Sequence, residues 1–285
     1  MRILNTTADI SSAFENGHFC IGKWEQYMDK WIPGAKEKCI ADMQRCLSGG
    51  YLWETDFLPV LNFVQNNPSK CKEVTNAFLY VTDHLDEKIE KVFGKTVDAD
   101  FVLYLGLCNG AGWVTEIEGK STILLGIEKI LELGWQGIDD MTGLIIHECG
   151  HLYHSQYGSS KVEIKLPEDK FLWQLFSEGV AMVFEQEIIG DEEYFHQDKN
   201  GWKSWCDKHA EHIKQSFCCD LKTMTPETQR YFGDWVNFEG YADTGYYLGA
   251  QFVRYMLRQD SFDAIIQYGL EAVKEKFGEY LQLEE

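Results

Sequence analysis

The strongest constraint on the fold is an apolar series in the middle of the chain that surrounds two histidines. Its members recur at the spacing of a buried helix: Leu144, Ile145, Ile146, Cys149 and Leu152. Two acidic residues at 139–140 precede the series, as is typical of a helix start. The pattern therefore predicts a buried helix from about residue 139 to 153 or 154, with His147 and His151 upon it.

The two histidines and the glutamate beside them form the pattern His-Glu-x-x-His, which suits a metal site that activates water. Because His147 and His151 are four residues apart, both imidazoles project from one helix face and are able to bind one tetrahedral Zn²⁺. Glu148 lies on the adjoining edge, where its carboxylate reaches a metal-bound water and takes the proton as general base. Cys149 is expected to be an apolar filler, and Gly150 to give room beside the metal.

A catalytic zinc requires a third protein ligand and one open position, and Glu178 is the best candidate for that ligand. It sits in a second apolar helix, expected over residues 170–188, where an unpaired charge would be costly. His154 ranks second, because it continues the helix of His151 and would crowd a site that needs a ligand from the opposite side. None of the remaining histidines belongs to a comparable His-Glu-x-x-His pattern in the sequence.

Short apolar runs before this helix indicate a small sheet. Residues 101–107 and 121–125 are the two runs, and both have the length and composition of strands. Between them, residues 113–117 alternate apolar and polar side chains, which predicts a half-exposed strand closed by a turn at 118–120. A small mixed sheet should therefore precede the helix of the two histidines.

The rest of the chain has the pattern of helices. Apolar residues recur at three- and four-residue spacing over 40–47 and 74–92, and again over 245–257 and 261–281. We therefore expect an N-terminal helical region over residues 1–95 and a catalytic region over 96–285, or one continuous domain. The acidic tail after 281 is expected to fray.

Composition excludes several classes of partner. The formal net charge of −20 argues against nucleic acid and anionic membranes, because phosphate binding requires clustered Lys and Arg. The nine cysteines are odd in number and lack a regular spacing, which favours free thiols in a reducing compartment. No apolar segment has the length of a signal core or a membrane span. We therefore expect a cytoplasmic protein.

The pattern His-Glu-x-x-His with a downstream Glu resembles the gluzincin peptidases, whose zinc is held by two His and one Glu. More narrowly, five segments resemble a family of largely uncharacterised predicted Zn-dependent proteases: Leu103–Gly106, Asn109–Gly110, His147–His151, Glu178–Ala181 and Tyr247–Gly249. This resemblance covers roughly residues 100–255. It implies a zincin-like α+β fold, mostly helical, and hydrolysis of peptides or proteins at a Zn²⁺ ion.

The gluzincin resemblance implies two further roles. An extended substrate would pair with an exposed sheet edge above the zinc helix, and the segment most like that edge includes Asn109, Gly110, Ala111 and Gly112. A hairpin turn that uses its glycines only for backbone geometry is an equally good interpretation of this segment. The other role is a tyrosine that donates to the oxyanion of the reaction. Tyr246 or Tyr247 would serve, and Tyr241 is nearby in sequence.

Two other functions fit the same residues. One is a zinc hydrolase of a non-peptide amide or ester, because the same activated water serves either substrate. The other is a non-catalytic protein that keeps a zincin fold to bind zinc or a partner. Glu148 would be dispensable in such a protein, so its presence argues for catalysis.

Overall fold

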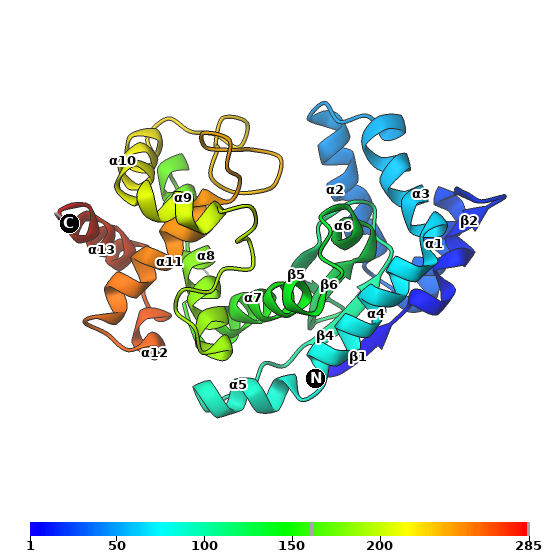
Figure 1. Cartoon of the computed structure of the whole chain (residues 1–285), viewed down its shortest axis with the longest axis horizontal. Helices are drawn as coiled ribbons and strands as arrows, with labels where there is room; N and C mark the ends of the chain where they lie inside the picture. The colour runs from blue at the N-terminus through cyan, green and yellow to red at the C-terminus, as the bar shows by residue number, and fades with distance from the viewer. Residues whose placement is uncertain (160–161, 284–285) are drawn as a thin grey trace. The chain divides into compact units, whose positions relative to one another are not determined.

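The computed structural model of the protein describes residues 1–159 and 162–283 (Figure 1). The chain divides into two compact units, Met1–Glu148 and Cys149–Glu285. The division falls inside one continuous helix, α7 (Ile138–Tyr157), which carries the His-Glu-x-x-His pattern. The first histidine therefore belongs to the N-terminal unit, and the second belongs to the C-terminal unit.

A four-stranded mixed sheet with the order β1-β4-β6-β5 forms the centre of the N-terminal unit. Strands β1 (Arg2–Asn5), β4 (Asp100–Tyr104) and β6 (Lys120–Gly126) are parallel, and β5 (Gly112–Ile117) is antiparallel to β6. Both turn residues between β5 and β6 have positive φ, as a tight hairpin requires. Strand β5 therefore lies at the edge of the sheet.

Besides the start of α7, the N-terminal unit contains several α-helices. They are α1 (Ile21–Trp31), α2 (Lys36–Ser48), α3 (Leu58–Asn66), α4 (Pro68–Thr82), α5 (Leu85–Phe93) and α6 (Ile127–Glu132). A short hairpin of β2 (Phe14–Glu15) and β3 (His18–Phe19) precedes them. Trp24 and Tyr27 of α1 fix the end of β4, because the indole N–H donates to Leu105 O and the phenol accepts from Leu105 N. Helix α1 thereby positions the loop that leads to β5.

The described part of the C-terminal unit consists of helices joined by irregular segments. Besides the end of α7, it contains α8 (Pro167–Ile189), α9 (Trp202–Lys208), α10 (Ala210–Asp220), α11 (Thr244–Leu257), α12 (Phe262–Ile265) and α13 (Leu270–Leu281). Helices α8 and α11 pack at very close range. A Cβ at Gly179 would lie 2.2 Å from Gly249 O, and one at Gly249 would lie 2.6 Å from Leu175 O. Glycine at both positions is therefore what lets the two backbones touch.

The expected mixture of α and β structure with a small mixed sheet is confirmed. Strand β1 was not expected, and it pairs the first residues of the chain with β4, so the N-terminal region is not helical alone. The apolar series over 74–92 forms two helices rather than one, because Asp83 and His84 leave helical geometry and His84 has a φ of 56°. The series over 261–281 is likewise interrupted between α12 and α13.

Two further expectations concern the chain as a whole. Across residues 1–159 and 162–283, no helix combines the length and apolar character needed to cross a membrane. All nine cysteines are free thiols. The expected fraying of the acidic tail concerns mainly residues 284–285, which lie outside the described residues.

Candidate metal centre

Three of the expected metal ligands lie together. His147, His151 and Glu178 each offer a ligand atom, and these atoms all lie within 4.8 Å of one another. The continuous helix α7 fixes the two histidines relative to each other, and Glu178 comes from the middle of α8. The side chains of His151 and Glu178 are 25% and 14% exposed, so this cluster is open to solvent on one side.

The spacing within the cluster fits a tetrahedral ion. The Nε2 of His151 lies 3.2 Å from Oε2 of Glu178. Two donors that are each about 2.0–2.1 Å from a tetrahedral zinc lie about 3.3 Å apart, so little movement would be needed to bind one. Two imidazoles and one carboxylate are also the donor types that catalytic zinc sites use. The residues present therefore fit the metal that the sequence suggests.

Gly150 has a different role from the expected one. A Cβ at this position would lie 2.7 Å from the Cα of Ala181 and 3.1 Å from its carbonyl oxygen. Gly150 therefore lets α7 pack directly on α8, rather than leaving room beside a metal. This close approach is what brings Glu178, one turn before Ala181, near to His151. Cys149 is fully buried, as expected of a small filler.

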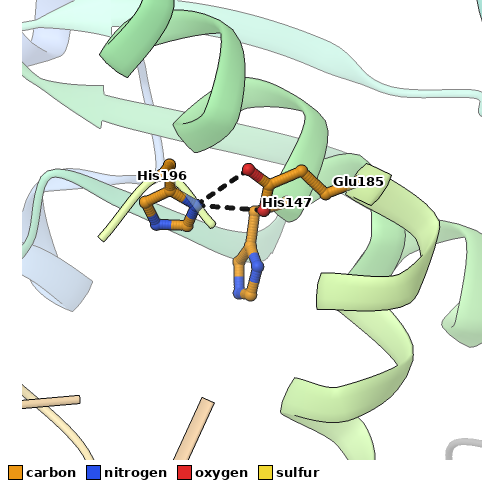
Figure 2. Close-up of side chains that lie close together, drawn as sticks. All are labelled: His147, Glu185 and His196. Carbon is orange, nitrogen blue, oxygen red and sulfur yellow. Dashed lines mark hydrogen bonds and ion pairs between the residues drawn. The ribbon is translucent and has the colours of Figure 1, made fainter. Parts of the chain in front are cut away.

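A second cluster shares His147 and was not expected from the sequence. It consists of His147, Glu185 and His196, whose ligand atoms also lie within 4.8 Å of one another (Figure 2). His196 Nδ1 lies 3.0 Å from both carboxylate oxygens of Glu185. The side chains of Glu185 and His196 are 0% and 5% exposed, so this cluster is closed to solvent.

Of the two residues that join His147 in this second cluster, only Glu185 could have been singled out from the sequence. Glu185 follows Glu178 by two helical turns, which places both carboxylates on one face of α8 and could have drawn attention to it. His196 lies in the irregular segment between α8 and α9. No periodicity connects such a residue with a helix, so no pattern in the sequence singles it out.

His154, the second choice for the third ligand, is placed elsewhere. It is buried, and its ring packs against the rings of Trp173 and Phe176 at centroid distances of 5.9 and 5.5 Å. Burial, together with the nearby His151, lowers the pKa of His154 to about 4. Within the described residues, neither cluster of ligand atoms includes it. His154 is therefore a neutral residue of the core.

Glu148, the expected general base, lies against the edge strand within the N-terminal unit. A Cβ at Gly112, the first residue of β5, would be 2.9 Å from Oε1 of Glu148 and 2.9 Å from Cδ1 of Leu144. Glycine at this position therefore allows the edge strand to run directly over the turn of α7 that carries Glu148. The sheet edge and the carboxylate are thus immediate neighbours.

The other residues expected on the edge segment precede the strand. Asn109 holds the loop in place, because its Nδ2 donates to Cys39 O and to Asp42, and its Oδ1 accepts from Leu107 N. Ala111 is buried, and its carbonyl accepts from Gly126 N. Asn109, Gly110 and Ala111 thus form a structural loop, and only Gly112 belongs to the edge strand itself.

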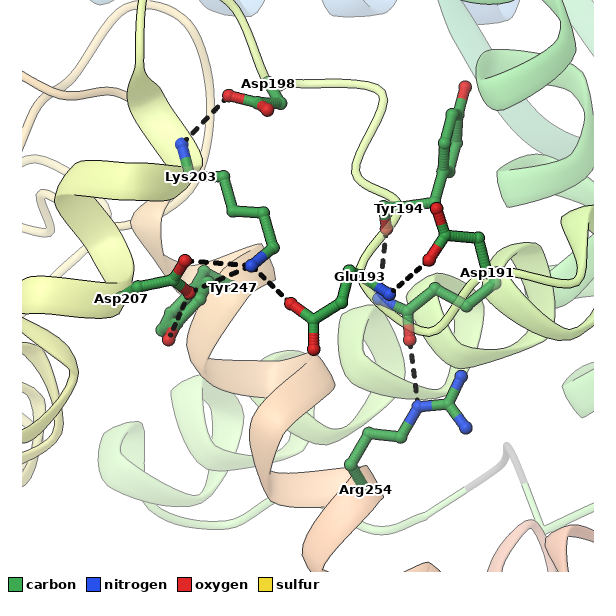
Figure 3. Close-up of polar contacts among 9 residues, drawn as sticks. Asp191, Glu193, Tyr194, Asp198, Lys203, Asp207, Tyr247 and Arg254 are labelled. Atoms are coloured by element: carbon green, nitrogen blue, oxygen red, sulfur yellow. Dashed lines mark hydrogen bonds and ion pairs between the residues drawn. The ribbon is translucent and has the colours of Figure 1, made fainter.

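The two candidate tyrosines have different surroundings in the C-terminal unit. The hydroxyl of Tyr247 donates to Asp207, which also pairs with Lys203 (Figure 3). The ring of Tyr247 packs against Phe195 and Trp202. Burial and the Asp207 carboxylate raise the pKa of Tyr247. Tyr247 is therefore a packing residue whose hydroxyl is already engaged.

Tyr246 lies in the first turn of α11 beside a pocket and is partly exposed. The preceding Asp243 accepts a hydrogen bond from Gly233 N, and burial raises its pKa to about 6, with Glu178 and His196 among the charges that act on it. The start of α11 is therefore electrostatically coupled to both carboxylate–imidazole clusters. Of the two tyrosines, Tyr246 remains the candidate oxyanion donor.

Comparisons of the chain with models of protein families, with curated proteins and with solved structures found no match.

Proposed function

We propose that this protein is a zinc-dependent peptidase with a zincin-like fold and a gluzincin-type site. The observation that carries the proposal is the convergence of His147, His151 and Glu178 to within 4.8 Å, with 3.2 Å between His151 and Glu178. These residues would hold Zn²⁺ as its three protein ligands. The position of Glu148 beside the sheet edge supports the same function, because base and substrate strand would then be neighbours.

Each residue has a distinct role in this proposal. Zinc, when bound, supplies an activated water and polarises the substrate carbonyl. Glu148 accepts the proton of the attacking water and then passes it to the leaving amine. Tyr246 donates a hydrogen bond to the oxyanion, and loss of such a donor costs on the order of a hundredfold in rate. The free edge of β5, from Gly112 onward, pairs with the extended peptide.

Exposure favours this ligand set over the buried one. A catalytic zinc must keep one position open for water and substrate. His151 and Glu178 are partly exposed, whereas Glu185 and His196 are closed to solvent and already bonded to each other. An ion held by the buried cluster would have a structural role.

Two alternatives use the same residues. A hydrolase of a non-peptide amide or ester would need the same water and base. A zinc-binding protein without catalysis would need the ligands but not Glu148. The free edge of β5 favours a peptide substrate, because it offers backbone hydrogen bonds that only an extended chain can fully use.

Partner and compartment follow from composition. A net charge of −20 is unfavourable for binding nucleic acid or anionic membranes, so we propose a peptide or protein substrate. Nine free thiols are typical of a reducing compartment, which favours the cytoplasm.

The decisive experiment compares the wild type with Glu148→Gln. Zinc content is measured by elemental analysis, and cleavage of a mixed peptide library is followed by mass spectrometry. We expect both proteins to contain one zinc and only the wild type to cleave peptides. A wild type without zinc, or a variant that cleaves equally well, would refute the proposal. Cleavage of esters or simple amides without peptides would favour the first alternative.

A further inference from the structure

A pocket of about 200 Å³ lies entirely within the C-terminal unit, and one of its walls is the helix that carries the proposed metal ligand Glu178. It is formed by the first half of α8, the irregular segment after α10 and the start of α11. Four aromatic residues are among those that line it: Phe171, Phe232, Trp235 and Tyr246. Lys170, Gln174 and Gln229 are its polar lining residues. Aromatic residues therefore form the largest group in its lining.

Helix geometry places this pocket one turn from the proposed metal site. Gln174 precedes Glu178 by four residues on α8, so their side chains are neighbours on one helix face. On the opposite wall, Gly233 donates its N–H to Asp243, the residue that immediately precedes α11. A substrate that reaches the metal is thus able to place a neighbouring side chain in the pocket.

The wall of the pocket is ordered by its own hydrogen bonds. Gln229 bonds back to its own loop, because its Nε2 donates to Phe232 O and its Oε1 accepts from the N–H groups of Tyr231 and Phe232. A Cβ at Gly233, which has a φ of 102°, would lie 2.4 Å from the indole of Trp235. Glycine there is what allows this indole to fold back over the loop, and such preorganisation favours binding.

The size and exposure of the pocket indicate its occupant. Whole small-molecule ligands occupy about 300–1,000 Å³, so about 200 Å³ suits one large side chain better. Trp235 is 66% exposed although it lines the pocket, which leaves apolar surface in contact with water until something covers it. Such a surface favours an aromatic or large aliphatic group.

We propose that this pocket is the specificity pocket of the protein, and that it binds a large apolar or aromatic side chain of a substrate residue next to the cleaved bond. This inference rests on the proposed peptidase function. It adds the substrate class, which neither the metal ligands nor the general base determine.

The test uses cleavage and binding in parallel. Cleavage of a mixed heptapeptide library is compared for wild type, Trp235→Ala and Gln174→Phe, the last of which fills the pocket. Binding of fluorescein-labelled heptapeptides with Ala or Phe at the selected position is measured by anisotropy on Glu148→Gln protein. We expect Phe to exceed Ala by on the order of tenfold or more in both measurements, because the buried ring leaves water.

Each variant should remove this preference while zinc content is unchanged. Tyr80→Ala is the matched control, because Tyr80 is an equally exposed aromatic, at 64%, outside the pocket. Its preference for Phe should equal that of the wild type. Peptide cleavage with no preference for large apolar residues, or a preference that survives both pocket variants, would overturn the pocket and leave the peptidase intact. Selective binding of Phe peptides without any cleavage would overturn the peptidase and support the pocket.

Discussion

The Nε2 of His151 lies 3.2 Å from Oε2 of Glu178, and this contact joins α7 to α8 at the proposed metal site. It depends on a small interface between the two helices. Gly150 and Ala181 allow the backbones to approach, and Glu178 lies one turn before Ala181. The contact therefore results from helix packing, and it holds a histidine and a carboxylate at the separation that one zinc ion requires.

Replacing Glu178 should separate the two possible ligand sets. We expect Glu178→Ala to lower zinc affinity by more than the roughly 10–100-fold that loss of an outer-shell partner causes, because a direct ligand is removed. Metal content after dialysis against graded chelator concentrations measures this. Glu168→Ala is the control, since Glu168 lies on the same helix outside both clusters. If His196→Ala abolishes binding and Glu178→Ala does not, the buried cluster holds the metal instead.

A methyl group at Gly112 should disturb the general base without removing the metal. Its Cβ would lie 2.9 Å from Oε1 of Glu148, so either the strand or the carboxylate must move. We expect Gly112→Ala to lower kcat by on the order of tenfold to a hundredfold with zinc content unchanged. Steady-state kinetics on a cleaved peptide would measure it.

Gly110→Ala is the matched control for this experiment. The nearest atom to its added Cβ is Gly112 O at 3.4 Å, which is an ordinary contact. Equal kcat for wild type and Gly112→Ala would mean that Glu148 does not need the position it has beside β5.

The packing of α8 on α11 should be intolerant of a single methyl group. We expect Gly179→Ala to destabilise the protein by at least about 1–3 kcal/mol, because its Cβ would lie 2.2 Å from Gly249 O and the helices must separate. Gly278→Ala lies in α13 with no atom within 4 Å of its Cβ, and it should stabilise the protein by about 0.5–1 kcal/mol. Denaturant unfolding measures both, and similar effects of the two substitutions would contradict this account.

The sequence predicted those features that depend on local periodicity. The helix around His147, the hairpin of residues 113–125 and the helix that carries Glu178 each have a spacing that only one type of element satisfies. Because α7 and α8 have the pattern of buried helices with small residues between them, the candidate ligands His147, His151 and Glu178 could be grouped from the sequence before the structure placed them together.

Features that depend on long-range packing left no such pattern. Strand β1 is only four residues long, and it is a strand because it pairs with β4, nearly a hundred residues later in the chain. His196 lies in a loop, and only the folded chain brings it to Glu185. The role of Gly150 also depends on long-range packing. The sequence shows a glycine at this position, but it does not show that the neighbour in close contact is Ala181 of α8.

Glu128 should make stability depend on pH. This carboxylate is buried and accepts the N–H groups of Gly106 and Cys108 in the loop before β5. Burial raises its pKa from 4.5 to about 7, and the two N–H donors only partly offset this. Because the folded protein holds a proton that the unfolded chain releases, its contribution is fully present below pH 4.5 and is lost as the pH rises through 7. At about 1.4 kcal/mol per pH unit, the loss is on the order of 3 kcal/mol.

Glu128→Gln should abolish this dependence, because the amide has a similar shape but does not titrate in this range. The measurement is the free energy of unfolding of both proteins at intervals from pH 4 to 8. Asp243 and His154 also titrate with altered pKa values, but they are present in both proteins and cancel in the difference. The stability of the wild type relative to the variant should therefore fall as the pH rises from 4.5 to 7 and then stay level. A constant difference across this range would mean that Glu128 is already ionised when buried, and that the N–H donors of the loop outweigh the cost of burial.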